Sequence, residues 1–347
     1  MVNVKWIIGE ISHSMKKKYS YWPKPRLKHS QFNFSDVYIS HSKIERDIES
    51  MYPNTSAVLV SSGRCAISLI LESFNFKRNE RVFTNEFSSH CVIEAISRFN
   101  LPIFSIDDSI QAALVYHHWG FRHNAYKTGD SHYDVIDDYA DSLLVPGHFE
   151  FSKYSKYALL SLPKIYGCPN GGLILCKYLN DAKKLRTLRD NRSNQEFVYD
   201  LLRMYSLCKD SVNPIWSGVA SSLGRVSRLA RVLIYNSIKD TNRLVTIRMK
   251  NLKTVSTELS NYSEANGIIP CCLPLYQHPC VENFIPLRID SEELASSHRN
   301  FNRNYNYNEC NWVKVLPLPV HQDLNPKMLS KACEIIRNLR MTILLPY

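Results

Sequence analysis

The sequence lacks the features that would assign it to several simple classes of protein. Its ten cysteines contain no C-x-x-C pair, so we expect the reduced thiols of a cytoplasmic protein and no disulfide framework. No stretch approaches the about 18 consecutive apolar residues of a membrane-spanning helix, and the apolar patch near the N-terminus is too short for a signal peptide. We find no internal repeat, low-complexity segment or nucleic-acid-binding motif, so we expect neither a membrane span nor direct nucleic-acid binding.

Positive charge is the main bias in the composition. The 347 residues include 43 Lys or Arg and 32 Asp or Glu, which gives a formal net charge of +11. With 44% hydrophobic and 22% charged residues, the chain otherwise has the composition of a folded globular protein. The charge favours polyanions, anionic membrane surfaces or phosphorylated small molecules, and by itself it does not choose among them.

Residues 57 to 177 alternate short apolar runs with stretches of helical periodicity. In SAVLVSSGRCAISLILESF, Ala57–Val60 predicts a buried strand, Ser61–Gly63 a turn, and the apolar residues that follow an almost wholly buried helix. YDVIDDYADSL and YALLSLPK each contain another strand. Strands that alternate with helices imply an α/β fold with a mainly parallel sheet covered by helices.

The pattern changes after about residue 178. Long helix-like segments come first, then short strand-like runs return from about residue 265, and PKMLSKACEIIRNLR predicts a closing helix. We predict an N-terminal arm over residues 1–35 and a large α/β domain over 36–210. Residues 211–347 are predicted to form a long helix and a smaller α+β domain.

Three groups of residues follow predicted strands, at the sheet edge where ligands of open parallel sheets bind. Ser62-Gly63-Arg64 opens a helix and aims backbone N–H groups at an anion. Asp137-Asp138 places carboxylates at a strand end, and Lys164 supplies an amine. Separately they indicate a helix cap, a turn and a solvated charge. Together they are what pyridoxal phosphate requires: a phosphate site, an acid for the pyridinium nitrogen and an amine for the aldehyde.

At these segments the sequence resembles the DegT/DnrJ/EryC1/StrS sugar aminotransferases, which are fold-type I transferases dependent on pyridoxal phosphate. AVLVSSGRCAISLIL is similar to the phosphate-binding Asn-Ser-Gly-Thr-x-Ala-Leu segment of the family. YDVIDDYADSL is similar to its Val-Ile-Glu-Asp-Ala-Ala-Gln segment, and SLPKIYGCPNGGLIL to its Ser-x-x-x-Thr-Lys segment followed by Gly-Gly. The resemblance runs from about residue 40 to the C-terminus.

The resemblance implies a role for each candidate residue. Lys164 would bind the cofactor covalently and move a proton, with a pKa lowered by burial and by the cationic cofactor, and Asp138 would keep the ring nitrogen protonated. Tyr166 and, from the small domain, His321 are candidate substrate contacts. The implied cofactor-binding residues are Ser62, Gly63, Arg64, Phe87 or His90 as the ring cover, Asp138, Asp141, Ser161 and Lys164.

The sequence departs from the family pattern at several positions. Asp141 stands where the family has Gln or His beside the phenolic oxygen, and Leu159 replaces a serine, which leaves Ser161 as the nearest hydroxyl. The Asn-Tyr-Arg segment by which a neighbouring subunit completes the phosphate site is missing near residues 215–230. Ser222, Arg225 and Arg228 are the candidate substitutes.

The activity implied by the resemblance is transfer of an amino group from an amino acid, usually glutamate, to a keto-sugar that is usually nucleotide-linked. A homodimer with its site between the subunits is implied as well. Two alternatives stay open: an elimination or sugar dehydratase reaction on the same fold, which the presence of Lys164 disfavours, and a non-catalytic binder or regulator.

Metal binding is not expected. His117, His118 and His123 follow one another closely, but adjacent residues of a strand point to opposite faces, so structural or substrate-lining roles are favoured. Cys271 and Cys272 are adjacent, a spacing that seldom serves one tetrahedral ion.

Overall fold

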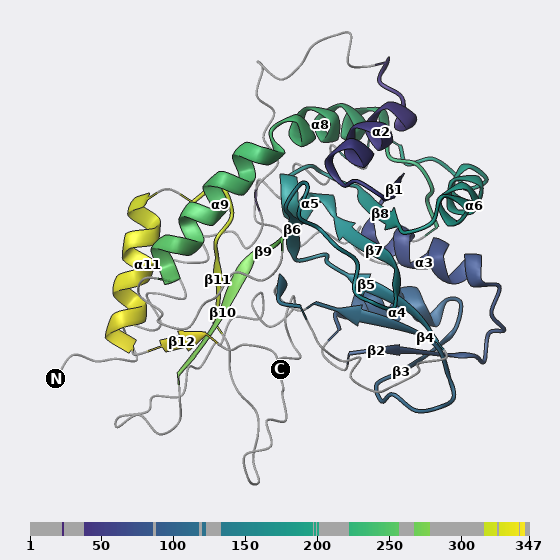
Figure 1. Cartoon of the computed structure of the whole chain (residues 1–347), viewed down its shortest axis with the longest axis horizontal. Helices are drawn as coiled ribbons and strands as arrows, with labels where there is room; N and C mark the ends of the chain where they lie inside the picture. The colour runs from purple at the N-terminus through teal and green to yellow at the C-terminus, as the bar shows by residue number, and fades with distance from the viewer. Residues whose placement is uncertain are drawn as a thin grey trace.

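The computed structural model has a seven-stranded sheet at its centre (Figure 1). It describes residues 38–85, 88–117, 120–122, 133–196, 198, 200, 222–256, 267–277, 316–324, 326–339 and 341–343, together with Pro23. The strand order is β1-β8-β7-β5-β4-β2-β3. Only β8 runs against the others, because its pairings with β1 and β7 are antiparallel while the pairings among β7, β5, β4, β2 and β3 are parallel.

The strands of this sheet are short apolar segments. Their bounds are β1 Ser56–Val60, β2 Arg81–Thr84, β3 Leu101–Ile103, β4 Ile110–Tyr116, β5 Asp134–Asp138, β7 Ser155–Ser161 and β8 Gly172–Cys176. Every residue of β8 is buried, as are all residues of β5 after the first. Continuous burial of this kind belongs to strands covered on both faces.

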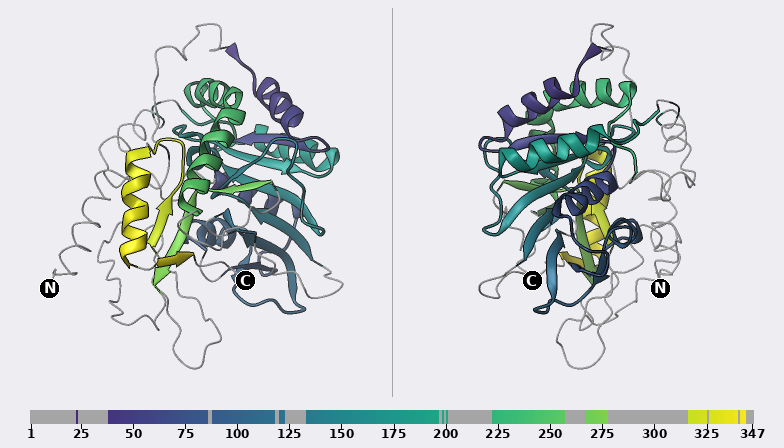
Figure 2. Two further views of the ribbon diagram at one scale, coloured as in Figure 1. Left: turned by 60° about the vertical axis from the view of Figure 1, so that its left-hand side comes forward. Right: turned by 90° about the vertical axis from the view of Figure 1, so that its right-hand side faces the viewer.

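Helices cover both faces of the sheet. On one face, α3 (Gly63–Phe74), α4 (His90–Ser97) and α6 (Leu179–Asp190) pack on residues such as Val58, Leu114 and Ile136. On the other face, α2 (His41–Met51) and α8 (Arg228–Lys239) pack on residues such as Leu59 and Leu160. The views in Figure 2 show the helices on the two sides.

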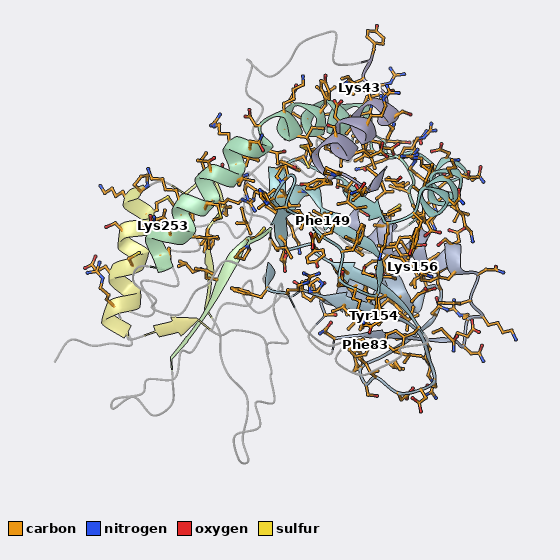
Figure 3. The ribbon with its side chains drawn as sticks, viewed as in Figure 1. Lys43, Phe83, Phe149, Tyr154, Lys156 and Lys253 are labelled. Atoms are coloured by element: carbon orange, nitrogen blue, oxygen red, sulfur yellow. The ribbon has the colours of Figure 1, made fainter. Side chains whose placement is uncertain are left out.

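An aromatic cluster strengthens this second face. The ring of Phe149, labelled in Figure 3, meets the rings of Tyr139 and Tyr52 edge-on, at centroid distances of 5.9 and 6.2 Å. Edge-to-face contacts of this kind are favourable beyond the area that they bury. Tyr139 follows Asp138 directly in the chain. Its contact with Phe149 therefore holds the backbone next to the two aspartates.

The rest of the described chain forms smaller units. Helix α9 (Thr241–Ser256) follows α8 after a break at Asp240, and α11 (Pro326–Leu339) packs against α9. The strands β10 (Cys272–Gln277), β11 (Leu316–Pro319) and β12 (Met341–Ile343) form an antiparallel sheet. A two-stranded sheet of β6 (Ser142–Leu144) and β9 (Ile268–Pro270) connects the end of β5 to this part.

The mixed, mainly parallel sheet with helices on both faces confirms the fold class predicted from the sequence. The predicted strand, turn and helix over residues 57–71 are present as β1, the Ser62 cap and α3. The domain boundaries stay predictions, and residues 1–35 lie outside the described part apart from Pro23. Lys164 does not lie in a plain loop between two strands, because residues Leu162–Tyr166 form a short helix, α5.

Candidate active site

Three strands of the large sheet, β1, β5 and β7, end at the same edge. Val60 and Ser161 both lie opposite Gly172 of the antiparallel β8, and Asp138 lies opposite Leu159 of β7. The residues that follow these three strands therefore converge. This edge holds the carboxyl ends of the parallel strands, which is where ligands bind in open α/β sheets.

The two aspartates at the end of β5 point to opposite faces. Asp137 is fully buried, and its Oδ1 lies 3.0 Å from Nε2 of His117 while its Oδ2 accepts a hydrogen bond of 2.7 Å from the Ser152 hydroxyl. The His117 ring stacks on Tyr139 at 4.2 Å. Burial acts to raise the pKa of Asp137, but His117 and the hydrogen bonds outweigh it and hold this pKa below its ordinary value. Both carboxylate oxygens of Asp137 are therefore in contact with other side chains of the protein.

Asp138 lies on the face covered by α3 and α4. Ile136, two residues earlier, packs in the apolar cluster of those helices, and side chains two apart in a strand share a face. Oδ1 of Asp138 accepts a hydrogen bond of 2.9 Å from the backbone N–H of Ala140. Burial has the largest effect and raises the pKa of Asp138 to about 7, against the opposing influence of that hydrogen bond and of the Lys164 charge. A carboxyl group of this kind gains or loses a proton near neutral pH.

Lys164 forms an ion pair with Asp141. Its Nζ lies 2.8 Å from Asp141 Oδ1, with the lysine side chain 24% exposed and the aspartate side chain 1% exposed. The Tyr116 hydroxyl at the end of β4 donates to the other oxygen, Asp141 Oδ2. Burial acts to lower the pKa of Lys164, but the charge of Asp141 outweighs it, so the pKa lies above its ordinary value. The prediction of a lowered pKa is therefore wrong for the chain by itself, because a carboxylate faces the amine.

The turn before α3 has the shape of an anion site. Ser62 caps the helix, with its hydroxyl accepting a hydrogen bond of 3.1 Å from the Cys65 N–H. No atom lies within 4 Å of the position that a Cβ on Gly63 would take, so space is open beside the first helical turn. On the other side of the turn, a Cβ on Gly172 would lie 2.4 Å from the Ser62 carbonyl carbon. Glycine at 172 therefore allows β8 to approach the turn.

Arg64 adds a buried cation to this turn. Its residue exposure is 9%, and burial lowers the pKa of its guanidinium, while Cys91 and Glu94 of α4 act in the opposite direction. The arginine therefore lies close to the start of α4. Cys91 also acts on the pKa of Lys164 and of Tyr116, so the first turn of α4 faces the site.

Arg248 of α9 contacts the backbone of the helix that carries Lys164, a role that the sequence analysis did not predict. It is fully buried, and its guanidinium donates to the carbonyl of Ile165 at 2.6 Å, to that of Lys164 at 3.5 Å and to Cys271 Sγ at 3.2 Å. Gln322 bonds both to Arg248 and to the Ile165 carbonyl. A cation at the carboxyl end of α5 satisfies carbonyls that the short helix leaves unpaired.

The remaining predicted residues lie at different distances from this centre. His90 is exposed at the first position of α4, and Ser161 is partly exposed at the end of β7. The Tyr166 hydroxyl lies 3.1 Å from the Thr241 hydroxyl, and burial raises the pKa of Tyr166 to about 12. Phe87 lies outside the described residues. Which ring covers a cofactor therefore stays a prediction.

His321 is buried, in the turn that follows β11. Its Nδ1 accepts a hydrogen bond of 3.2 Å from the Asp323 N–H, and its carbonyl accepts one of 3.0 Å from Asn251. Its neighbour Gln322 reaches α5 directly. The loop of the small domain therefore contacts the lysine-bearing helix, while a substrate contact by His321 stays a prediction.

Structural and substrate-lining roles were both favoured for His117, and its buried contact with Asp137 suits the structural one. His118 and His123 lie outside the described residues. Within the described part of the chain there is no cluster of three or more His, Cys, Asp or Glu side chains arranged to hold a metal ion. The same residues include no helix long and apolar enough to cross a membrane.

The candidate substitutes for the missing Asn-Tyr-Arg segment lie around the start of α8. Arg225 is bound to Asp190, with a 2.7 Å distance between its Nε and Asp190 Oδ1. Ser222 and Arg228 are also described, and Arg228 is the first residue of α8. A role for any of them across a subunit interface stays a prediction.

The described groups fit pyridoxal phosphate. The open helix start at Gly63 suits its phosphate, Asp138 suits its pyridinium nitrogen, and Lys164 suits its aldehyde. All three belong to the same edge of the sheet.

Several solved structures with this fold are aminotransferases. A *Helicobacter pylori* aminotransferase involved in the biosynthesis of pseudoaminic acid is 12% identical, with a TM-score of 0.62 and coverage of 92% of this chain and 99% of that chain. A sugar aminotransferase from *Micromonospora echinospora* is 14% identical, with a TM-score of 0.59 and coverage of 91% and 98%. A DegT DnrJ EryC1 StrS aminotransferase from *Brucella abortus* is 12% identical, with a TM-score of 0.56 and coverage of 96% and 95%.

These likenesses confirm the fold expected from the sequence motifs, and the low identity fits a divergent member. No curated protein sequence matches the chain. The model of the family described as "Putative PLP-dependent aminotransferase" matches residues 44–339, which include every element from α2 to α11 except the first few residues of α2. The chain therefore belongs to this family of aminotransferases, whose cofactor is pyridoxal phosphate.

Proposed function

We propose that the protein transfers an amino group from an amino acid, with glutamate as the donor, to a keto-sugar carried on a nucleotide, in amino-sugar biosynthesis. The observation that carries this proposal is the placement of Lys164 and Asp138 at one sheet edge, beside the open start of α3. The sugar aminotransferases that share the fold support the acceptor class. The net charge of +11 suits a diphosphate.

The cofactor supplies an aldehyde for the amine of Lys164 and a ring that accepts electrons from the substrate carbon. Ser62, Gly63 and Arg64 would hold its phosphate, through backbone N–H groups at the start of α3 and one guanidinium. Asp138 holds a proton on the ring nitrogen, for which its carboxylate must be ionised. Burial raises the pKa of Asp138 to about 7, which leaves the carboxyl only partly ionised near neutral pH, and a positive ring would stabilise the carboxylate.

Lys164 has two tasks in this proposal. Its Nζ would hold the aldehyde of the bound cofactor, and once an amino acid has taken its place, the same Nζ would carry a proton to and from the substrate carbon. Arg248 and Gln322 hold the carbonyls of α5, so that the short helix keeps Nζ in place through both tasks. His117 and Ser152 fix Asp137 and with it the strand end that carries Asp138.

We also propose a cytoplasmic homodimer with the active site at the subunit interface. The free state of the seven described cysteines supports a reducing compartment, and the resemblance to the sugar aminotransferases supports the dimer. Light scattering at several protein concentrations measures the mass directly, and a monomer throughout would contradict a shared site.

The substrate is tested with the protein loaded with pyridoxal phosphate. Glutamate is supplied with a panel of nucleotide-linked 3- and 4-keto-sugars and their free-sugar analogues, and formation of 2-oxoglutarate and of the amino-sugar is measured. We expect turnover with at least one nucleotide-linked keto-sugar and little with the free sugars. Failure with every 3- and 4-keto-sugar, by a protein that does exchange its amino group with glutamate, would contradict the acceptor class.

A further inference from the structure

Asp141 contacts the Lys164 nitrogen and is itself bound by Tyr116, an arrangement that the sequence motifs do not predict. Asp141 Oδ1 is 2.8 Å from Lys164 Nζ, and Oδ2 accepts a hydrogen bond from the Tyr116 hydroxyl. Both oxygens of the carboxylate are therefore engaged, one by a cation and one by a neutral donor. The carboxylate is 1% exposed, so little water screens its charge.

Position 141 is held by contacts on each side. Its backbone carbonyl accepts a hydrogen bond of 2.9 Å from the Cys271 N–H, which ties it to the segment after β9. Tyr116 is itself fixed, because its backbone N–H donates to Asn85 Oδ1 at 3.0 Å. The carboxylate is thus aimed at Lys164 by β4, by the turn after β5 and by the small domain.

We propose that Asp141, oriented by Tyr116, keeps a positive charge on the Lys164 nitrogen, both while the amine is free and after it has bonded to the cofactor aldehyde. This inference rests on the proposed function, since it concerns the covalent role of Lys164. Asp141 and Tyr116 thereby act as residues that set the charge of the catalytic nitrogen, where the family places a neutral side chain.

The bonding step shows where this charge matters. The Lys164 ammonium and the aldehyde combine to give a protonated carbon–nitrogen double bond and one water, so the nitrogen loses two protons and these leave with the aldehyde oxygen. Before the nitrogen attacks, one proton must leave Nζ to expose its lone pair. Asp141 Oδ1, 2.8 Å from Nζ, opposes the loss of that proton because its charge stabilises the ammonium, and the same carboxylate would stabilise the positive nitrogen of the product.

Other titratable groups also lie near the Lys164 nitrogen and affect its pKa. Asp138 also acts to raise the pKa of Lys164, but more weakly than Asp141, and Cys91 acts in the same direction. The groups that face the pair from all elements around it are Tyr116 of β4, Asp138 of β5, Cys91 of α4, Cys271 and Cys272 near β10, and Arg248 of α9. Among the described residues, Asp141 forms a direct ion pair with Nζ, at 2.8 Å.

The test compares Asp141→Asn and Tyr116→Phe with the unaltered protein. Pyridoxal phosphate is added to each cofactor-free protein between pH 6.5 and 9.5, and the rate of covalent capture is followed by absorbance and by borohydride trapping. We expect Asp141→Asn to capture faster near neutral pH, by about tenfold for each pH unit by which the ion pair raises the Lys164 pKa. Tyr116→Phe is expected to shift the profile less, in the same direction.

The second measurement uses the loaded proteins. The absorbance band of the protonated carbon–nitrogen bond is titrated with alkali, and we expect it to be lost at a lower pH in Asp141→Asn, by about one unit or more. Asp134→Asn and Tyr157→Phe are the matched controls, because Asp134 pairs with Lys156 at the far end of β5 and Tyr157 lies near Phe74 on the α3 face. Both controls are expected to match the unaltered protein.

The outcomes separate this inference from the proposed function. If all proteins capture the cofactor with one pH profile and lose the band at one pH, Asp141 does not set the charge and the inference is overturned while the function stands. If neither the unaltered protein nor Asp141→Asn captures pyridoxal phosphate, both proposals fall. If Asp141→Asn does not fold, as judged by circular dichroism, Tyr116→Phe decides, and an unshifted profile in that variant overturns the inference.

Discussion

The two faces of the sheet at the end of β5 surround neighbouring carboxylates with different partners. Asp137 lies between His117 and Ser152, behind the aromatic cluster of Phe149, and its pKa is held low. Asp138 accepts a hydrogen bond from the backbone N–H of Ala140, and burial raises its pKa to about 7. The first carboxylate is stabilised by the protein itself, and the second needs a cation from outside. This difference supports the proposal that Asp137 stabilises the fold and that Asp138 serves the cofactor.

The largest effect is expected from the lysine that shares the Asp138 side. Lys164→Ala should abolish covalent capture of pyridoxal phosphate and reduce turnover by about 10,000-fold, because it removes both the amine and the proton carrier. Lys156→Ala is the matched control, since Lys156, labelled in Figure 3, is partly exposed on β7 and pairs with Asp134. Borohydride trapping and steady-state rates measure the two effects. Equal trapping in both variants would contradict the assignment of Lys164.

A pair of substitutions tests the comparison of the aspartates. Asp138→Asn should lower kcat by at least about 100-fold and leave a folded protein, because the neutral amide cannot keep the ring nitrogen charged. Asp137→Asn should instead destabilise the fold by about 3 to 5 kcal/mol, because it breaks a buried pair with His117. Denaturant melts and kcat are measured for both. A stable, inactive Asp137→Asn with an active Asp138→Asn would reverse the comparison.

The two carboxylates should also give stability profiles of opposite sign. Because the folded pKa of Asp138 is about 7 against an ordinary value of 3.8, stability of the cofactor-free protein should fall as pH rises from about 4 to 7. Asp137 has a lowered pKa, so its contribution is present above its ordinary pKa and is lost as the pH falls toward the folded value. The melting temperature should depend less on pH across this range in Asp138→Asn than in the unaltered protein. An unchanged slope would show that Asp138 does not titrate near neutrality.

The smallest effects are expected at the turn before α3. Gly172→Ala should destabilise the protein by about 1 to 3 kcal/mol, since a Cβ there would lie 2.4 Å from the Ser62 backbone. Gly63→Ala has open space and should leave stability nearly unchanged, while it weakens binding of pyridoxal phosphate by roughly tenfold or less. Melts and cofactor titrations separate the two. Unchanged cofactor affinity in Gly63→Ala would place the phosphate elsewhere.

The local parts of the site follow from the sequence. The strand, turn and helix from Ala57 onward show their periods directly, and Lys164 and Asp138 both come immediately after apolar runs. The choice of Asp138 over Asp137 rested on the family resemblance, and the structure adds the physical reason, which is the face of the sheet. A signal for Tyr116 existed as well, since it ends an apolar strand at the same edge.

The long-range parts of the site could not be read from local patterns. The contact of Tyr116, Asp141 and Lys164 joins three elements, and Arg248 reaches α5 from a helix 83 residues further along the chain. The sign of the Lys164 pKa shift depends on this contact, because burial alone would lower it. Burial of Lys164 is apparent from the local sequence, whereas the carboxylate that faces it becomes apparent only in the folded chain.

The most direct test of the account is the position of the cofactor on the chain. The loaded protein is reduced with borohydride, digested, and mapped by mass spectrometry for the peptide that carries the pyridoxyl phosphate group. The account predicts the group on Lys164 alone, with no labelled peptide in Lys164→Ala. A label on another lysine, or a protein that takes up no cofactor, would contradict it.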